Sequence, residues 1–133
     1  MPECYVMSIK KEYGLNLLHR RAFWEYRRRK SLIRRGDKIL LYATAPHKEL
    51  IGEFIVGDVI IGNSHDVWER TKQEVCYSIE EVVPYLESGN FPIAFRVTSP
   101  RIYSNPLPLD KIPFFKPPMS YCRAPEQLLS ILS

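Results

Sequence analysis

The sequence predicts an α+β fold, in which a small sheet, curved or closed into a β-barrel, carries short helices inserted between its strands. Four stretches rich in β-branched and aromatic residues have the composition of strands: 4–10, 37–44, 50–61 and 91–98. Gly52 and Gly57 interrupt the longest of them, and glycine within a strand is typical of bulges that curl a sheet. Two helix-start signals, at Ser64 and Ser78, fall between the last two strands.

In the N-terminal half, a first strand at 4–10 is followed by a short helix at 12–20, which Gly14 weakens. Residues 22–29 fit two patterns. Helical spacing would place Phe23 and Tyr26 on one face, whereas strand alternation would separate two sets: Ala22, Trp24 and Tyr26 on one side, and Phe23, Glu25, Arg27 and Arg29 on the other. Periodicity alone does not decide between a helix and a strand for these residues. A turn at 35–37 then leads into a strand at 37–44, which we expect at the centre of the sheet.

In the C-terminal half, Ser64 is the expected N-cap of one helix, and Ser78 with Glu81 predicts a capping box for a second. Residues 88–90 (SGN) should end that second helix. The proline-rich stretch 99–118 predicts an extended, irregular wrap rather than a linker. A last helix is expected over 124–132, with proline in its first turn.

The size and composition predict one domain, 1–133, with a core that needs no disulfide or metal staple. No apolar stretch is long enough to span a bilayer, and the N-terminus lacks a secretory signal, so we expect a cytoplasmic protein without membrane contact. Cys4, Cys76 and Cys122 form no CxxC pair, and Cys76 and Cys122 are expected to be buried and inert. The three histidines lack ligand spacing, so we expect no metal and no cofactor; only His47, in a loop after the central strand, merits a test.

The positive charge is concentrated in residues 19–38, HRRAFWEYRRRKSLIRRGDK. This segment holds nine Lys and Arg against Glu25 and Asp37, a net charge of +7, whereas the whole chain has +4. A local basic patch with embedded aromatic residues suits a polyanion with stackable faces, such as a nucleic acid. The alternative is a solvated charged face that binds nothing. Trp68, Tyr42 and Tyr77 are expected in the core rather than in a binding site.

The order of these features resembles the ASCH domain of the PUA-like superfamily. The resemblance covers about residues 3–125 and rests on YVMSIK, a short helix, WEYR, GDKILLYAT and LIGEFIVGDVI, with WERTKQEVCYSIEEVVPYLESG and KPPMSYCRAPE further on. The ASCH motif is G-x-K-x-x-E-x-R; Glu25 and Arg27 match its Glu and Arg, while Arg20 and Ala22 occupy the Gly and Lys positions. The resemblance implies a PUA-like barrel and selects the strand interpretation of 22–29.

The same resemblance implies that the chain binds RNA, or a nucleotide, in a basic cleft. Trp24 and Tyr26 would then pack into the core. The nucleotide-binding residues would be Phe23, Glu25, Arg27 and Arg29, and the phosphate-binding residues Arg20, Arg21, Arg28, Lys30, Arg34 and Arg35. RNA is the expected partner, and a regulator that binds DNA or a reader of a modified base (through Phe23, Trp68 or a tyrosine) are further hypotheses.

An alternative function is a hydrolase acting on RNA or on a modified nucleoside in the same cleft. One ASCH branch hydrolyses the amide of N4-acetylcytidine with the motif lysine, a threonine and a glutamate. Here the lysine position is Ala22 and the threonine position is Glu25, so we expect no activity of that kind. Glu25 and Glu74 are the catalytic candidates, and the neighbouring Arg27 is expected to lower the pKa of Glu25 and weaken it as a base.

Overall fold

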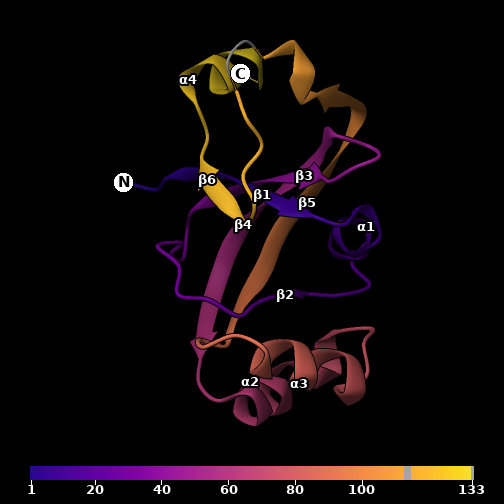
Figure 1. Ribbon diagram of the computed structural model, residues 1–133, viewed down its shortest axis with the longest axis vertical. Helices are drawn as coiled ribbons and strands as arrows, with labels where there is room; N and C mark the ends of the chain where they lie inside the picture. The colour runs from indigo at the N-terminus through magenta and orange to yellow at the C-terminus, as the bar shows by residue number, and fades with distance from the viewer. Residues whose placement is uncertain (113–114, 133) are drawn as a thin grey trace.

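Two long antiparallel strands, β4 (Glu49–Ile61) and β5 (Ile93–Pro108), run through the whole molecule (Figure 1). The computed structural model describes residues 1–112 and 115–132. Four shorter strands complete one six-stranded sheet in the order β2-β5-β4-β3-β1-β6: β2 (Trp24–Arg27), β3 (Lys38–Ala43), β1 (Cys4–Ile9) and β6 (Tyr121–Arg123). The pair β1 and β3 is parallel, whereas the other neighbours are antiparallel. The strand interpretation of β2 and the central position of β3 are thus confirmed.

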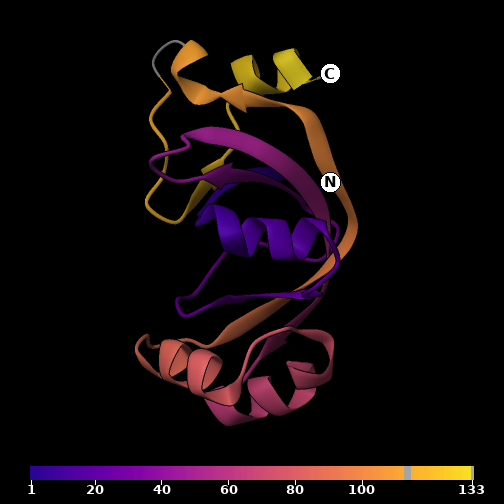
Figure 2. The same ribbon diagram turned by 90° about the vertical axis from the view of Figure 1, so that its right-hand side faces the viewer.

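The sheet is strongly curved, as predicted from the glycines of its longest strand. The register between β4 and β5 shifts near Gly52 and again between Val56 and Val59. Such shifts bend a strand and increase its twist. Figure 2 shows the result, a half-barrel that curls around helix α1 (Lys11–Leu18).

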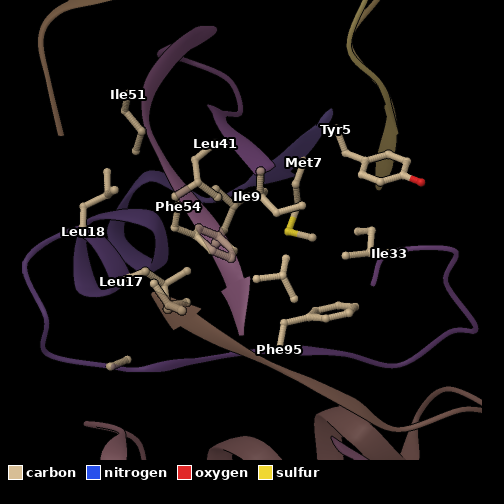
Figure 3. Close-up of a cluster of buried hydrophobic side chains, with 14 of the residues drawn as sticks. Tyr5, Met7, Ile9, Leu17, Leu18, Ile33, Leu41, Ile51, Phe54 and Phe95 are labelled. Atoms are coloured by element: carbon tan, nitrogen blue, oxygen red, sulfur yellow. The ribbon is translucent and has the colours of Figure 1, made fainter. Parts of the chain in front are cut away.

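The sheet and its helices enclose three clusters of buried side chains. The first lies inside the curl and includes Met7, Leu17, Phe54 and Phe95 (Figure 3). The second lies between β2 and the helices α2 (Ser64–Thr71) and α3 (Ile79–Glu87); its members include Trp24, Val67 and Leu86. The third joins the sheet to α4 (Glu126–Leu132) and includes Val6, Leu50 and Leu128. In the described part of the chain, no helix has the length and hydropathy to cross a membrane.

The capping predictions were right for α3 and off by one residue for α2. Ser78 and Glu81 form the predicted capping box, and α3 ends at Glu87, with Ser88 as its C-cap. In contrast, the N-cap of α2 is Asn63, whose side chain accepts a hydrogen bond from the Asp66 amide at 2.9 Å. Ser64 is already helical, and its hydroxyl donates to Glu87 at 3.3 Å instead. Both residues are common caps, so local sequence does not distinguish them.

The prediction of an irregular wrap after residue 98 was wrong up to Pro108. β5 continues through this stretch because it finds a partner: Ile102 pairs with Gly52, and Leu107 with Leu50. Pro100 and Pro106 fall where the register shifts, and Pro108 is the last residue of the strand, which are settings in which a sheet tolerates proline. The later part of the wrap includes residues 113 and 114, which lie outside the described residues. Two short 3-10 helices, η1 (Lys72–Glu74) and η2 (Leu109–Lys111), follow α2 and β5, and the short strand β6 was not predicted.

Candidate functional site

The strand β2 lies at the edge of the sheet, with α1 on one side and α3 on the other (Figure 1). Its side chains alternate as predicted. Trp24 and Tyr26 are buried in the second cluster, between β2 and the helices α2 and α3, whereas Glu25 and Arg27 face the opposite side. Glu25 Oε2 lies 2.9 Å from Arg27 Nη2, and the two side chains are 12% and 17% exposed. The edge strand therefore presents a nearly buried ion pair.

Arg27 also forms a hydrogen bond to a second strand, but one of its N–H donors has no partner among the described residues. Its Nη2 donates a hydrogen bond to the backbone oxygen of Ser8, at the end of β1, at 2.9 Å. Its Nε is buried and has no hydrogen-bond partner among the described residues. Buried polar atoms in folded proteins are almost always paired, so this donor marks a position where an acceptor from outside the chain fits.

A cavity of about 340 Å³ opens over this ion pair. Besides Glu25 and Arg27, its lining includes Lys10, Tyr13, Tyr77 and Tyr85. The rings of Tyr13 and Tyr77 meet edge to face, with centroids 5.8 Å apart. The Tyr77 hydroxyl accepts a hydrogen bond from Asn16 Nδ2 at 3.0 Å. Tyr26 also contributes to the lining, so four tyrosines surround the ion pair. We call this cavity the Glu25–Arg27 pocket.

Burial controls the ionisation of the pocket residues. Removal from water raises the pKa of Glu25, and the charge and hydrogen bond of Arg27 oppose this rise without cancelling it. Arg27 thus acts in the expected direction, but the expected net fall in the pKa of Glu25 was wrong, because it left out the desolvation of a carboxyl group whose burial the sequence does not reveal. Burial likewise raises the pKa of Tyr77 and of Tyr85, so both phenols remain hydrogen-bond donors.

Glu74 does not join Glu25. Its Oε1 accepts a hydrogen bond from Trp24 Nε1 at 2.9 Å, and its Oε2 pairs with Arg96 Nη1 at 2.6 Å. The Trp24 hydrogen bond is the main reason that the pKa of Glu74 is lowered, and Arg96 adds to it. The Glu74 backbone oxygen also accepts from the Phe23 amide, and the Phe23 ring lies under the Arg96 guanidinium, 5.0 Å from centroid to carbon. Glu74 and Phe23 thus lie outside the lining of the pocket.

The predicted phosphate ligands are dispersed. Arg28 lies at the pocket rim, where its guanidinium stacks 5.1 Å from the centroid of Tyr85 and donates to Ser88 Oγ at 2.6 Å. Arg29 and Lys30 follow it on the surface. The structure leaves Arg20 and Arg21 exposed after α1, and it places Arg34 and Arg35 around a different hollow.

The sequence interpretation missed Lys10, Tyr13, Tyr77 and Tyr85. Lys10 sits at the junction of β1 and α1, and Tyr13 follows it in the helix. Tyr77 was expected in the core, but it is half-buried and lines the pocket. The only local signal was the capping box of α3, which fixes the start of the helix that carries Tyr85. The remaining contacts join segments that are distant in sequence.

The other candidate residues lie apart from the pocket. Trp68 and Tyr42 are buried, as predicted, and Ala22 is fully buried. The expectation that Cys76 is buried was wrong, since this thiol is exposed, while Cys122 is partly buried. His47 lies on the exposed connection between β3 and β4. Among the described residues, no three His, Cys, Asp or Glu side chains gather closely enough to hold a metal ion.

Comparisons with known proteins agree with the resemblance that the sequence suggested. No protein-family profile matches the chain. An "ASCH domain-containing ribonuclease" from Zymomonas mobilis is 27% identical over 119 residues, which cover 86% of this chain and 80% of that protein. The crystal structure of ASCH from Zymomonas mobilis superposes with a TM-score of 0.86 at 24% identity, covering 98% of this chain and 94% of that one.

A more distant likeness is found in the N-terminal domain of McrB from Staphylothermus marinus. Its TM-score is 0.62 at 17% identity, and the match covers 99% of this chain and 94% of that one. These structural matches confirm the predicted fold, an α+β half-barrel with inserted helices.

Proposed function

We propose that this chain, an ASCH domain protein, binds RNA and holds one nucleotide in the Glu25–Arg27 pocket. The observation that carries the proposal is the nearly buried ion pair at the base of the pocket, in which Arg27 Nε has no partner among the described residues. Leaving such a donor unsatisfied costs about 1–3 kcal/mol, and an acceptor oxygen of a bound ligand would remove this penalty. A nucleotide carries such oxygens on its base and on its phosphate.

The walls of the pocket suit a nucleobase. Four tyrosines line it, and stacking on an aromatic side chain contributes about 1–3 kcal/mol per base. A base edge with a donor beside an acceptor would complement the carboxylate of Glu25 and the guanidinium of Arg27. The volume of about 340 Å³ lies within the range for small-ligand sites and admits one unstacked nucleotide but no duplex. Single-stranded RNA is therefore the proposed ligand.

Cations near the pocket mouth supply the phosphate contacts. Lys10 lines the pocket itself, and Arg28 lies at its rim. The exposed Arg29 and Lys30 continue this positive surface. The relative from Zymomonas mobilis is named a ribonuclease, and this name supports RNA over DNA as the partner.

Fluorescence anisotropy tests the proposal with labelled single-stranded RNA, transfer RNA and duplex DNA, at about 50–200 mM salt. We expect tightest binding to single-stranded RNA, weakening as salt rises. Lys10→Ala and Tyr13→Ala should each raise the Kd severalfold, because both side chains line the pocket and remain accessible. Lys48→Ala, which removes another exposed lysine between β3 and β4, is the matched control. Equal Kd values for all four proteins would refute the proposal.

Cleavage of the bound RNA is a second candidate function. Two observations favour it: the relative from Zymomonas mobilis is named a ribonuclease, and burial raises the pKa of Glu25 towards the range of a useful general base. Glu25 would accept the proton of the 2′-hydroxyl as this oxygen attacks the phosphorus. The P–O5′ bond would break, and the leaving 5′-oxygen would take a proton from water, giving a 2′,3′-cyclic phosphate and a 5′-hydroxyl, while the protonated Glu25 returns its proton to solvent.

The two functions are separated by Glu25→Gln, which keeps the shape of the side chain and removes its basicity. If the chain is a ribonuclease, this variant binds RNA as before but produces no cleavage. Cleavage at the original rate by Glu25→Gln, or no cleavage by the unaltered protein, would rule out this candidate and leave the binding proposal standing.

A further inference from the structure

A second hollow, of about 690 Å³, opens on the side of β2 to which Trp24 points. Its inner surface is apolar, formed by Trp24, Ile33, Val59 and Ile60. The Trp24 indole N–H is already bonded to Glu74, so the ring is fixed in position. The rim carries Arg34, Arg35, Arg70 and Asp58, which come from three separate segments of the chain. We call this feature the arginine hollow.

The charges of the arginine hollow are only partly balanced. Arg35 Nη1 pairs with Asp58 Oδ1 at 2.8 Å, and both side chains are exposed. In the described part of the chain, the guanidinium groups of Arg34 and Arg70 form no hydrogen bond or ion pair. Three guanidinium groups thus meet one carboxylate around an apolar surface. Guanidinium groups bind phosphate through two parallel hydrogen bonds, and the apolar surface can contact a base or ribose.

A short segment of the chain connects the Glu25–Arg27 pocket to the arginine hollow. Arg27 lines the pocket and Arg34 lines the hollow, and seven residues of chain span at most about 25 Å. The connecting segment carries Arg28, Arg29 and Lys30. Because β2 is the edge strand, no further strand of the sheet blocks the path from one side to the other. A strand of RNA that follows this segment would meet the cations Arg28, Arg29 and Lys30 between the two sites.

We infer that the arginine hollow is a second RNA subsite, which takes a nucleotide outside the pocket and binds its phosphate through Arg34 and Arg70. The inference rests on the proposed function, because it describes the path of an RNA whose other nucleotide occupies the Glu25–Arg27 pocket. A dinucleotide would be held by the pocket alone, while oligonucleotides of about 16 nucleotides would reach both subsites.

The double variant Arg34→Ala/Arg70→Ala tests the inference, since neither guanidinium supports the fold. Its control is Lys48→Ala/Arg123→Ala, which removes the same charge from exposed positions on the β3–β4 connection and β6. Anisotropy with the longer RNA should show an affinity about tenfold weaker for the test variant than for the control. The slope of log K against log salt should become shallower by about 1.4, which corresponds to two lost phosphate contacts on a single strand.

The short RNA and duplex DNA separate the outcomes. We expect the test variant to bind the dinucleotide as tightly as the control does. Equal losses on the short and long RNA, equal losses on duplex DNA, or no difference from the control would each overturn the inference. In each of these cases, the proposed function would still stand if Lys10→Ala raised the Kd for the short RNA. No binding of either RNA by the unaltered protein would overturn both.

Discussion

Trp24 and Glu74, fifty positions apart in the sequence, are joined by a 2.9 Å hydrogen bond from the indole N–H to Oε1. The second carboxylate oxygen of Glu74 pairs with Arg96, and its backbone oxygen accepts from Phe23. These contacts attach η1 to the first residues of β2, directly before Glu25. Glu74 is therefore a positioning residue: it fixes the edge strand whose next side chain faces the pocket, and it does not itself reach the pocket.

Glu74→Ala should destabilise the protein by about 1–3 kcal/mol, because it leaves the Trp24 N–H and the Arg96 guanidinium without their acceptor. Urea unfolding measures the difference. Glu69→Ala, which breaks only the exposed pair with Lys72, should change stability by about 0.5 kcal/mol or less. Equal effects of the two substitutions would show that the Trp24–Glu74 contact does not hold β2.

Structural features that depend only on residues close together in the sequence could be predicted. Alternation placed Trp24 and Glu25 on opposite faces, and the spacing of Ser78 and Glu81 predicted a capping box, since both signals act within one or two turns of chain. The extension of β5 could not be predicted in this way, because it depends on pairing with a strand some fifty residues earlier.

The same difference between local and long-range determinants applies to the candidate site. Glu25 and Arg27 could be predicted because both stand on one strand face. Lys10, Tyr13 and Tyr77 approach them only after the sheet has curled, and no local pattern marks such contacts. The direction of the Glu25 pKa also depends on burial, which is a property of the fold rather than of the neighbouring residues.

Arg27→Met should destabilise the protein by about 3–5 kcal/mol, because it leaves the carboxyl group of Glu25 buried without its partner. The double variant Glu25→Leu/Arg27→Met removes both charges and should recover most of this loss. Urea unfolding of the three proteins at pH 7 checks both values. A double variant as unstable as the single one would show that Arg27 stabilises the fold through Ser8 rather than through Glu25.

The stability of the protein should depend on pH through Glu25. Its pKa is raised in the folded state, so the folded protein holds this proton more tightly than the unfolded chain does. The resulting contribution is fully present below the ordinary value of 4.5 and is lost as the pH rises through the raised value. The free energy of unfolding of the unaltered protein, relative to Glu25→Gln, should thus decrease from pH 4.5 upwards; an increase would contradict the buried state of Glu25.

Cys76 should react with N-ethylmaleimide before the other two cysteines. Its thiol is exposed, whereas Cys4 and Cys122 are partly buried, and burial raises the pKa of both, that of Cys4 to about 11. Because the thiolate is the reactive form, a brief treatment at pH 7 should give one adduct, which mass spectrometry locates. Cys76→Ser should abolish that adduct. Labelling of Cys4 or Cys122 at the same rate would show that their surroundings open in solution.

Gly52→Ala should destabilise the half-barrel by about 1–3 kcal/mol. A Cβ at this position would lie 2.6 Å from the backbone oxygen of Arg101 and 2.6 Å from Leu18 Cδ1. The side chain of Leu18 can move, but the oxygen of Arg101 belongs to β5 and is fixed by its pairing with β4. The added methyl group would therefore act on the register shift that curls the sheet around α1. Gly62→Ala is the matched control, since its Cβ would meet Asp66 Cβ at an ordinary 3.7 Å. Thermal unfolding should give a clearly lower Tm for Gly52→Ala alone, and equal Tm values for both variants would mean that the curl does not need a glycine at position 52.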